Sequence, residues 1–147
     1  ITEFLSAPAY FLEPDPYTTL TEPSMAANCL GITAYNDANN SLYVRAGRGY
    51  SKNGRIRPDL AAPGVNVSTP FGRETGSSMA AAITAGAAAQ FFQWAVVEGN
   101  NRVVESRELK NSLIRGADRK SALSYPNRSW GYGTLNLEGT FEVLADV

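Results

Sequence analysis

The alternation of apolar and polar positions predicts several short strands in the first half of the chain. Apolar residues cluster at 29–35, 42–46 and 65–67, and stretches rich in asparagine, glycine or proline separate them. Apolar clusters separated by stretches of this kind are typical of strands joined by turns. Between the last two clusters, Leu60 leads into the turn-forming pair Pro63–Gly64. We therefore expect strands at the three clusters and a loop over 70–76.

From Ser77 onward the pattern changes to that of a helix. Apolar residues, most of them alanine, then occupy nearly every face until Glu98 and Gly99 end the run. A helix that is hydrophobic all round is normally buried. Its small side chains, including Gly86, favour close packing against a sheet. The sequence thus predicts a long buried core helix beginning near Ser77.

Two shorter helices are predicted in the last third of the chain. The first covers about 107–115, with Ser106 as its N-cap and Gly116 at the C′ position. The second covers 137–144 and follows a short strand at 135–137. Strands that alternate with helices are typical of an α/β fold with a parallel sheet.

The first 23 residues differ in character from the rest. Four prolines hold this segment in extended geometry, namely Pro8, Pro14, Pro16 and Pro23. We interpret residues 1–23 as an extended arm or linker with one short strand at 17–21. The remaining residues, 24–147, form the folded part.

Composition excludes several classes of partner. The chain has 147 residues, which suits one domain or a large piece of one, and its net charge of -1 implies no nucleic-acid partner. We interpret the basic residues 45, 48, 52, 55 and 57 as a solvated loop. The single cysteine, Cys29, excludes an internal disulfide and is expected to be a buried structural residue.

A membrane span is not expected either. The longest weakly polar stretch covers 79–97, and four residues interrupt it: Thr84, Gly86, Gln90 and Gln93. A bilayer span needs about 20 predominantly apolar residues.

The candidate chemistry lies at the start of the long helix. Ser78 follows Gly76 and precedes the alanine run, which places its hydroxyl in the first helical turn beside unpaired N–H groups. Those donors suit a developing oxyanion, so Ser78 is a candidate nucleophile for acyl transfer. On these residues alone, an ordinary N-cap serine is the simpler interpretation. The chain also contains no histidine, the usual base that activates such a serine.

Three motifs in order resemble a known family and favour the nucleophile. They are Arg57–Val67 (RPDLAAPGVNV), Gly76–Gly86 (GSSMAAAITAG) and Trp130–Asn136 (WGYGTLN). This order is similar to that of the C-terminal part of the subtilisin-like serine peptidases, the subtilases of peptidase family S8. The alanine-rich form of the second motif resembles the clostridial Csp-type germination proteases, as does the segment 11–23. In that branch, the segment follows an inserted β-rich domain.

The resemblance implies a partial subtilisin-like α/β domain, with residues 24–147 as the C-terminal part of the catalytic domain and Ser78 as its nucleophile. It also implies that the catalytic Asp and His, and an oxyanion Asn, lie upstream of this segment. The chain departs from the family pattern at Ser77, Ala82 and Ile83, where Thr, Pro and His are usual. That family His is a packing residue, so its replacement leaves the proposed chemistry intact.

Other site residues follow from the resemblance alone. Pro23 aligns with a proline that is cis in many subtilases, which would place Thr21, Glu22 and Ser77 at the substrate pocket. A trans proline in a linker is the alternative, because most X-Pro bonds are trans. Asp59 resembles a structural acid that supports the nucleophile. No cofactor is expected; three aspartates are candidates for loop calcium ligands without a spaced cluster, namely Asp15, Asp37 and Asp118.

The expected function is therefore that of a serine endopeptidase segment that is inactive alone. Its partners would be a peptide or protein substrate and the N-terminal remainder of the protease, with self-association of exposed sheet edges as an alternative. The family resemblance implies a secreted or spore-associated location. Two rival interpretations stay open: a pseudoprotease or scaffold that only binds, and a processed chain that pairs with a separate histidine-bearing chain.

Overall fold

The structure is a computed structural model that describes residues 10–145, and Pro8 lies outside this range. Its elements, in chain order, are β1 (Ile32–Asn36), β2 (Ser41–Leu42), β3 (Leu60–Pro63), β4 (Val67–Thr69), β5 (Gly72–Glu74), α1 (Ser77–Phe92), the π-helical turn η2 (Gln93–Val97), α2 (Ser106–Arg115) and α3 (Leu137–Ala145).

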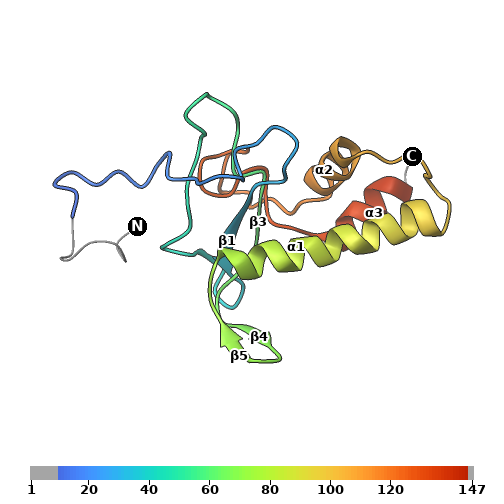
Figure 1. Cartoon of the computed structure of the whole chain (residues 1–147), viewed down its shortest axis with the longest axis horizontal. Coiled ribbons are helices and arrows are strands. Elements are labelled where there is room, and N and C mark those ends of the chain that lie inside the picture. Colours follow the sequence, from blue (N-terminus) through green and yellow to red (C-terminus); the bar gives the residue numbers. More distant parts are fainter. Residues whose placement is uncertain (1–9, 146–147) are drawn as a thin grey trace.

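A small sheet in the order β2-β1-β3 organises the fold. β1 and β3 run parallel, with Ile32 opposite Leu60, whereas β2 is antiparallel to β1. Helix α1 packs on both β1 and β3, and α2 packs on α3. Figure 1 shows α1 running away from the sheet, with α2 and α3 gathered beside its far half. This arrangement confirms the expected α/β class, with a parallel strand pair and helices packed against it.

The main core lies where the C-terminal half of α1 meets α2 and the start of β3. Phe91, Leu60 and Leu113 are essentially fully buried there. Aromatic side chains extend this core toward α3, because Trp94 lies 5.9 Å from Phe91 and 5.8 Å from Phe141 between ring centroids. Burial of large apolar side chains supplies most of the favourable free energy of folding.

The long helix is buried on one side only. Its interior side consists of Ala80, Thr84, Ala87 and Phe91, and residues such as Ala85 on other faces are exposed. The prediction of a helix buried all round is therefore wrong for this chain. The physical reason is that β1 has little strand pairing on the edge away from β3, so no further strand among residues 10–145 lies beneath that side of α1.

The helix also continues without a break into η2 and ends at Glu98, as predicted. The joined stretch Ser77–Val97 has 21 residues, and an 18-residue window within it has a mean hydropathy of 1.3, which meets the length and composition of a membrane span. Core helices of soluble proteins meet the same test, so this is weak support for a span. Its contacts with β1 and β3 are those of a core helix.

Strand boundaries differ from the predictions in several places. Strand β3 (Leu60–Pro63) was not predicted, and the strand expected at 65–67 is found at Val67–Thr69. Residues 17–18 form a turn and 19–21 have no regular structure, and the second strand is shortened to Ser41–Leu42. The chain leaves β2 because the Tyr43 N–H donates to Ala34 and a turn then follows to Ala46. The expected loop at 70–76 holds strand β5, which pairs with β4 in a hairpin. The expected strand at 135–137 is reduced to isolated bridges at Thr134.

The helix ends also differ in detail. α2 begins at Ser106, and Glu105 is the N-cap without a side-chain hydrogen bond. Gly116 has a φ of -80°, so it is not a left-handed cap. A Cβ atom at this glycine would lie 2.3 Å from the Thr140 Cα. Glycine is thus required because α2 and α3 approach closely, not because of its dihedral freedom.

Candidate active site

Backbone contacts within this chain fix the start of α1. The Gly64 N–H donates to the Tyr35 carbonyl, and the Gly76 N–H donates to the Gly64 carbonyl at 2.7 Å. A Cβ atom at Gly64 would lie 2.6 Å from the Ala34 Cβ and 2.8 Å from the Gly76 carbonyl oxygen. Only glycine allows this approach. The turn after β3 therefore anchors the first turn of α1 to the sheet.

Ser78 lies in that first turn and is exposed. The N-cap is Gly76, which makes no side-chain capping bond, so the interpretation of Ser78 as an N-cap does not describe the structure. Within residues 10–145, neither Ser77 nor Ser78 has a side-chain hydrogen-bond partner. The Ser78 hydroxyl is thus free, and it sits at the positive end of a 16-residue helix.

A cavity of about 930 Å³ adjoins this helix end. Thr21, Ser77 and Ser78 all line it, so the structure brings three of the four predicted site residues together. Glu22 instead lines a separate hollow with Pro23 and Lys52. The Glu22–Pro23 peptide bond is cis, in agreement with the family resemblance and not with the trans alternative.

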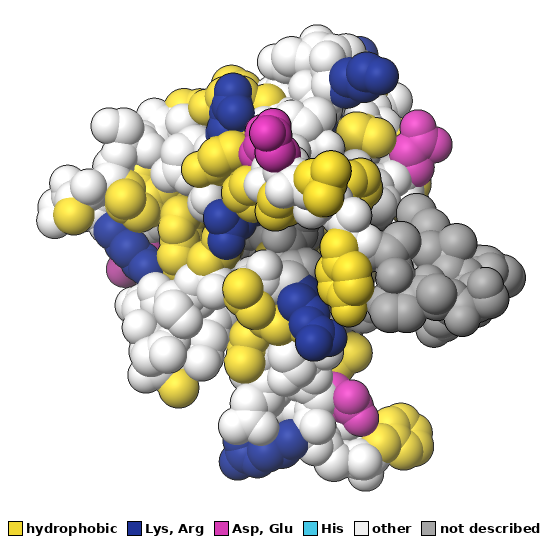
Figure 2. Space-filling view, turned by 90° about the vertical axis from the view of Figure 1, so that its left-hand side faces the viewer, with side chains coloured by type: hydrophobic (Ala, Val, Ile, Leu, Met, Phe, Trp, Pro, Cys, Tyr) yellow, Lys and Arg dark blue, Asp and Glu magenta, His cyan; other side chains and the backbone are white. Residues whose placement is uncertain are grey.

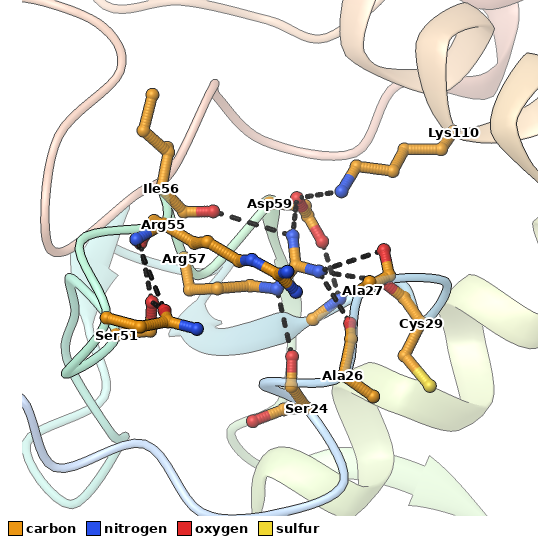
Figure 3. A network of polar contacts seen from close by, with 12 residues as sticks. Ser24, Ala26, Ala27, Cys29, Ser51, Arg55, Ile56, Arg57, Asp59 and Lys110 are labelled. Carbon is orange, nitrogen blue, oxygen red and sulfur yellow. Dashed lines mark hydrogen bonds and ion pairs between the residues drawn. The ribbon is translucent and has the colours of Figure 1, made fainter.

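Beneath this cavity wall lies a buried cation, Arg57, which is 3% exposed. Its guanidinium donates to the carbonyls of Ser24 at 3.0 Å, Ala26 at 2.8 Å and Cys29 at 3.3 Å (Figure 3). The interpretation of the basic cluster as a solvated loop is therefore wrong for Arg57. This side chain ties the turn after Pro23 to the segment that enters β3.

Asp59 is the counter-ion of Arg57 and is fully buried. Its Oδ1 accepts from Arg57 Nη1 and from Lys110 Nζ, each at 2.6 Å, and its Oδ2 accepts from the Gly31 N–H at 2.7 Å. Every contact is with a donor of the protein itself, which fits a supporting role rather than catalysis. Asp59 thus joins the start of β3 to Gly31, the residue before β1, and to Lys110 of helix α2, whose ammonium points at the carboxylate in Figure 3.

Sequence reasoning missed Arg57 and Lys110 as members of this site. The sequence does contain a signal for Arg57. It lies two residues before Asp59, and Asp59 directly precedes an apolar strand. Buried carboxylates are normally paired, so that acid needed a cation. Lys110 carries no such signal, because only the packing of α2 brings it to Asp59.

Tyr35 lies near the end of β1 and outside the cavity lining. Burial raises the pKa of Tyr35 to about 12, and the hydrogen bond to Asp37 and the charge of that carboxylate add to the effect. Its ring lies 5.6 Å from that of Trp130, over which the Lys120 ammonium sits at 3.8 Å. This cluster packs the Gly-rich segment onto the sheet.

Two further expectations concern metals and thiols. The described part of the chain holds no group of three or more acidic, cysteine or histidine residues placed for a metal. The three candidate aspartates accept hydrogen bonds from protein groups: Asp15 from the Tyr17 N–H, Asp37 from the Tyr35 hydroxyl and Asp118 from the Asn136 amide. Cys29 is a free thiol and is only half-buried, so the expectation of full burial is wrong.

Comparison with known proteins identifies the family of this chain. The model of the Subtilase family, Peptidase_S8, matches residues 13–133. Among solved structures, the CspB protease of Clostridium perfringens superposes with a TM-score of 0.87 at 33% identity, covering 92% of this chain and 31% of CspB. The chain thus spans less than a third of the length of that relative. No curated protein matches the chain.

Two more distant structures share the fold. The patellamide maturation protease PatA has a TM-score of 0.68 at 21% identity, covering 89% of this chain and 48% of PatA. The prenylagaramide maturation protease PagA has a TM-score of 0.69 at 22% identity, covering 87% of this chain and 46% of PagA. Identities this low support the likeness of fold alone.

Proposed function

The chain belongs to the subtilase family, and we propose that it is the C-terminal part of a serine endopeptidase with Ser78 as its nucleophile. The observation that carries this proposal is the free Ser78 hydroxyl in the first turn of α1, at the edge of a cavity. We also propose the division into an arm at 1–23 and a catalytic part at 24–147. A secreted or spore-associated location is part of the same proposal.

The proposed reaction is acyl transfer followed by hydrolysis. Ser78 Oγ bonds to the scissile carbonyl carbon while its proton passes to a histidine, which then protonates the leaving amine. Water, deprotonated by the same histidine, releases the acyl group and restores the serine. The Ser78 N–H, at the start of the helix, donates to the oxyanion. The histidine and its aspartate come from outside this chain, which has no histidine.

Three residues are proposed to contact substrate. Thr21 and Ser77 line the cavity that holds Ser78. Glu22 lines a separate hollow. Its proposed contact is with a part of the substrate peptide that extends beyond the cavity beside Ser78.

The test compares this chain with a longer polypeptide that also carries the preceding part of the protease. The longer form is expected to cleave a chromogenic peptide and to react with a fluorophosphonate probe, and Ser78→Ala removes both activities. Ser121→Ala, at an exposed serine outside the cavity lining, is the matched control and keeps them. The isolated chain is expected to show no turnover. Turnover by that chain, abolished by Ser78→Ala, contradicts the proposal.

A pseudoprotease or scaffold that binds without catalysis is the second candidate, because this chain covers only 31% of the CspB protease and does not itself contain the base. The coding sequence upstream discriminates between the two, because a pseudoprotease would also lack the Asp or His motif there. A processed chain that pairs with a separate histidine-bearing chain is the third arrangement. Co-purification of such a partner would support it.

A further inference from the structure

A second hollow, of about 460 Å³, lies where the end of the arm meets a loop near the C-terminus. Tyr17 lines it from the arm, Tyr50 lines it from the loop after β2, and residues 123, 124 and 127–130 complete its wall. None of these residues lines the cavity beside Ser78. The hollow is therefore separate from the site of the proposed reaction.

Arg128 lines this hollow with its guanidinium against two aromatic rings. The guanidinium carbon lies 5.1 Å from the ring centroid of Tyr17 and 5.4 Å from that of Tyr50. Stacking on aromatic faces orients a guanidinium and leaves the N–H groups at its edge available. Within residues 10–145, the Arg128 side chain donates no hydrogen bond and forms no ion pair. Its donors are thus oriented but unused.

Hydrogen bonds fix the wall that carries this arginine. The Arg128 carbonyl accepts from the Gly49 N–H at 2.8 Å, and the Tyr50 hydroxyl donates to the Pro126 carbonyl at 3.2 Å. The Asn127 side chain accepts from the backbone N–H groups two and three residues later, at 3.1 and 2.8 Å. The wall is thus formed before any ligand arrives, which lowers the entropic cost of binding.

Other side chains around the hollow offer both polar and apolar contacts. Tyr17, Ser124 and Ser129 line it, and none of their hydroxyl groups forms a hydrogen bond within the described part of the chain. Leu123, which is 41% exposed, and Trp130 supply apolar surface. A hydroxyl group can donate to an anion. The wall therefore suits an anionic group that is joined to an apolar one.

Charge indicates which anion fits. Among the described residues that line the hollow, Arg128 is the single cation, and none is acidic. Lys120, which lies over the Trp130 ring, donates instead to the Asn40 carbonyl at 2.6 Å, and Asp15 accepts from a backbone N–H. Figure 2, which views the side where the arm and loops gather, shows hydrophobic side chains spread between isolated basic ones. One positive charge matches a carboxylate better than a phosphate ester, which carries nearly two negative charges.

We propose that this hollow binds a carboxylate with an apolar neighbour, as in an acidic peptide segment. The carboxylate accepts two parallel hydrogen bonds from the edge of the Arg128 guanidinium, and the neighbouring apolar side chain packs on Leu123. A glutamate side chain and a C-terminal carboxylate share this chemistry, and the test separates them. The inference does not depend on the proposed function, because binding requires neither Ser78 nor a histidine.

The test titrates the isotope-labelled 147-residue chain with the peptide acetyl-Leu-Glu-Leu-amide and follows the backbone amide resonances by NMR. Saturable shifts are expected at residues 123–130. Arg128→Met keeps an unbranched side chain but removes the guanidinium, and it should weaken binding at least fivefold. Arg115→Met is the matched control, because Arg115 is exposed on α2 and does not line the hollow; its affinity stays within twofold. Unchanged resonances elsewhere check that both variants fold.

Two further peptides identify the source of the carboxylate. Acetyl-Leu-Gln-Leu-amide has no negative charge and should bind at least fivefold more weakly than the glutamate peptide. The same glutamine peptide with a free C-terminal carboxylate tests a chain terminus as the ligand. If it binds in a way that requires Arg128, the hollow accepts a terminal carboxylate; if it does not bind, the hollow selects the glutamate side chain.

Several results would overturn the proposal. They are equal affinity for the glutamate and glutamine amides, equal weakening in the two methionine variants, and no binding of either charged peptide. Competition by inorganic phosphate that is stronger than competition by acetate would assign the hollow to a phosphoryl group and refute the choice of a carboxylate.

Discussion

Replacing Asp59 with asparagine removes the counter-ion that the buried Arg57 has among residues 10–145. Asp59 is 0% exposed and Arg57 is 3% exposed, so neither side chain can turn to water. Three donors converge on the two carboxylate oxygens, from Arg57, Lys110 and Gly31. Asparagine offers one acceptor oxygen in their place and turns its own N–H groups toward the remaining donors.

The expected cost follows from that geometry. Removing one partner of a buried ion pair typically costs about 3–5 kcal/mol, because the other charge stays buried without compensation. The free energy of unfolding of a domain is only about 5–15 kcal/mol. Asp59→Asn should therefore remove a third or more of the stability. Lys110→Met should cost only about 1 kcal/mol, because Asp59 keeps Arg57 and the Gly31 N–H as partners.

Urea unfolding at pH 7, followed by the fluorescence of Trp94 and Trp130, measures these free energies. Asp118→Asn is the matched control, because Asp118 is exposed and binds a single side chain, Asn136. We expect it to cost less than about 1 kcal/mol. If Asp59→Asn and Asp118→Asn lower the stability equally, the buried pair does not hold the fold together as argued.

Three further predictions concern packing and titration. Gly116→Ala places a methyl group against Thr140 and should lower the free energy of unfolding in urea by about 1–3 kcal/mol. An unchanged free energy of unfolding would contradict the close approach of α2 and α3. Phe91→Ala should lower the stability by about 3–5 kcal/mol, and a smaller loss would indicate that the core refills. Because the pKa of Tyr35 is raised to about 12 from 10.0, the unfolded state ionises first, so stability should fall as pH rises above 10. At pH 11 the free energy of unfolding should be lower by about 1.4 kcal/mol than below pH 10. The Tyr35→Phe variant should not show this loss.

The sequence predicted the helices well, because helix formation depends on residues that are close together in the chain. The alanine run from Ser77, its end at Glu98 and the apolar spacing of α2 all reflect interactions within a few residues. Family motifs, and not periodicity, directed attention to Ser78 and to the cis bond before Pro23. The structure then placed Thr21 and Ser77 at the same cavity as Ser78.

The failures share a different cause, which is dependence on distant partners. Burial of α1 depends on how many strands lie beneath it, and the sequence of the helix carries no record of that number. The role of Arg57 depends on carbonyls about thirty residues earlier in the chain, at Ser24 and Ala26. The hairpin β4–β5 was missed because Gly72 and Arg73 give no alternating pattern.

The Gly76–Gly64 contact is made within this chain, so its own residues anchor the turn that precedes Ser78 to the sheet. Under the proposed function, the base of Ser78 comes from another part of the protease, and its arrival would require no rearrangement of this turn.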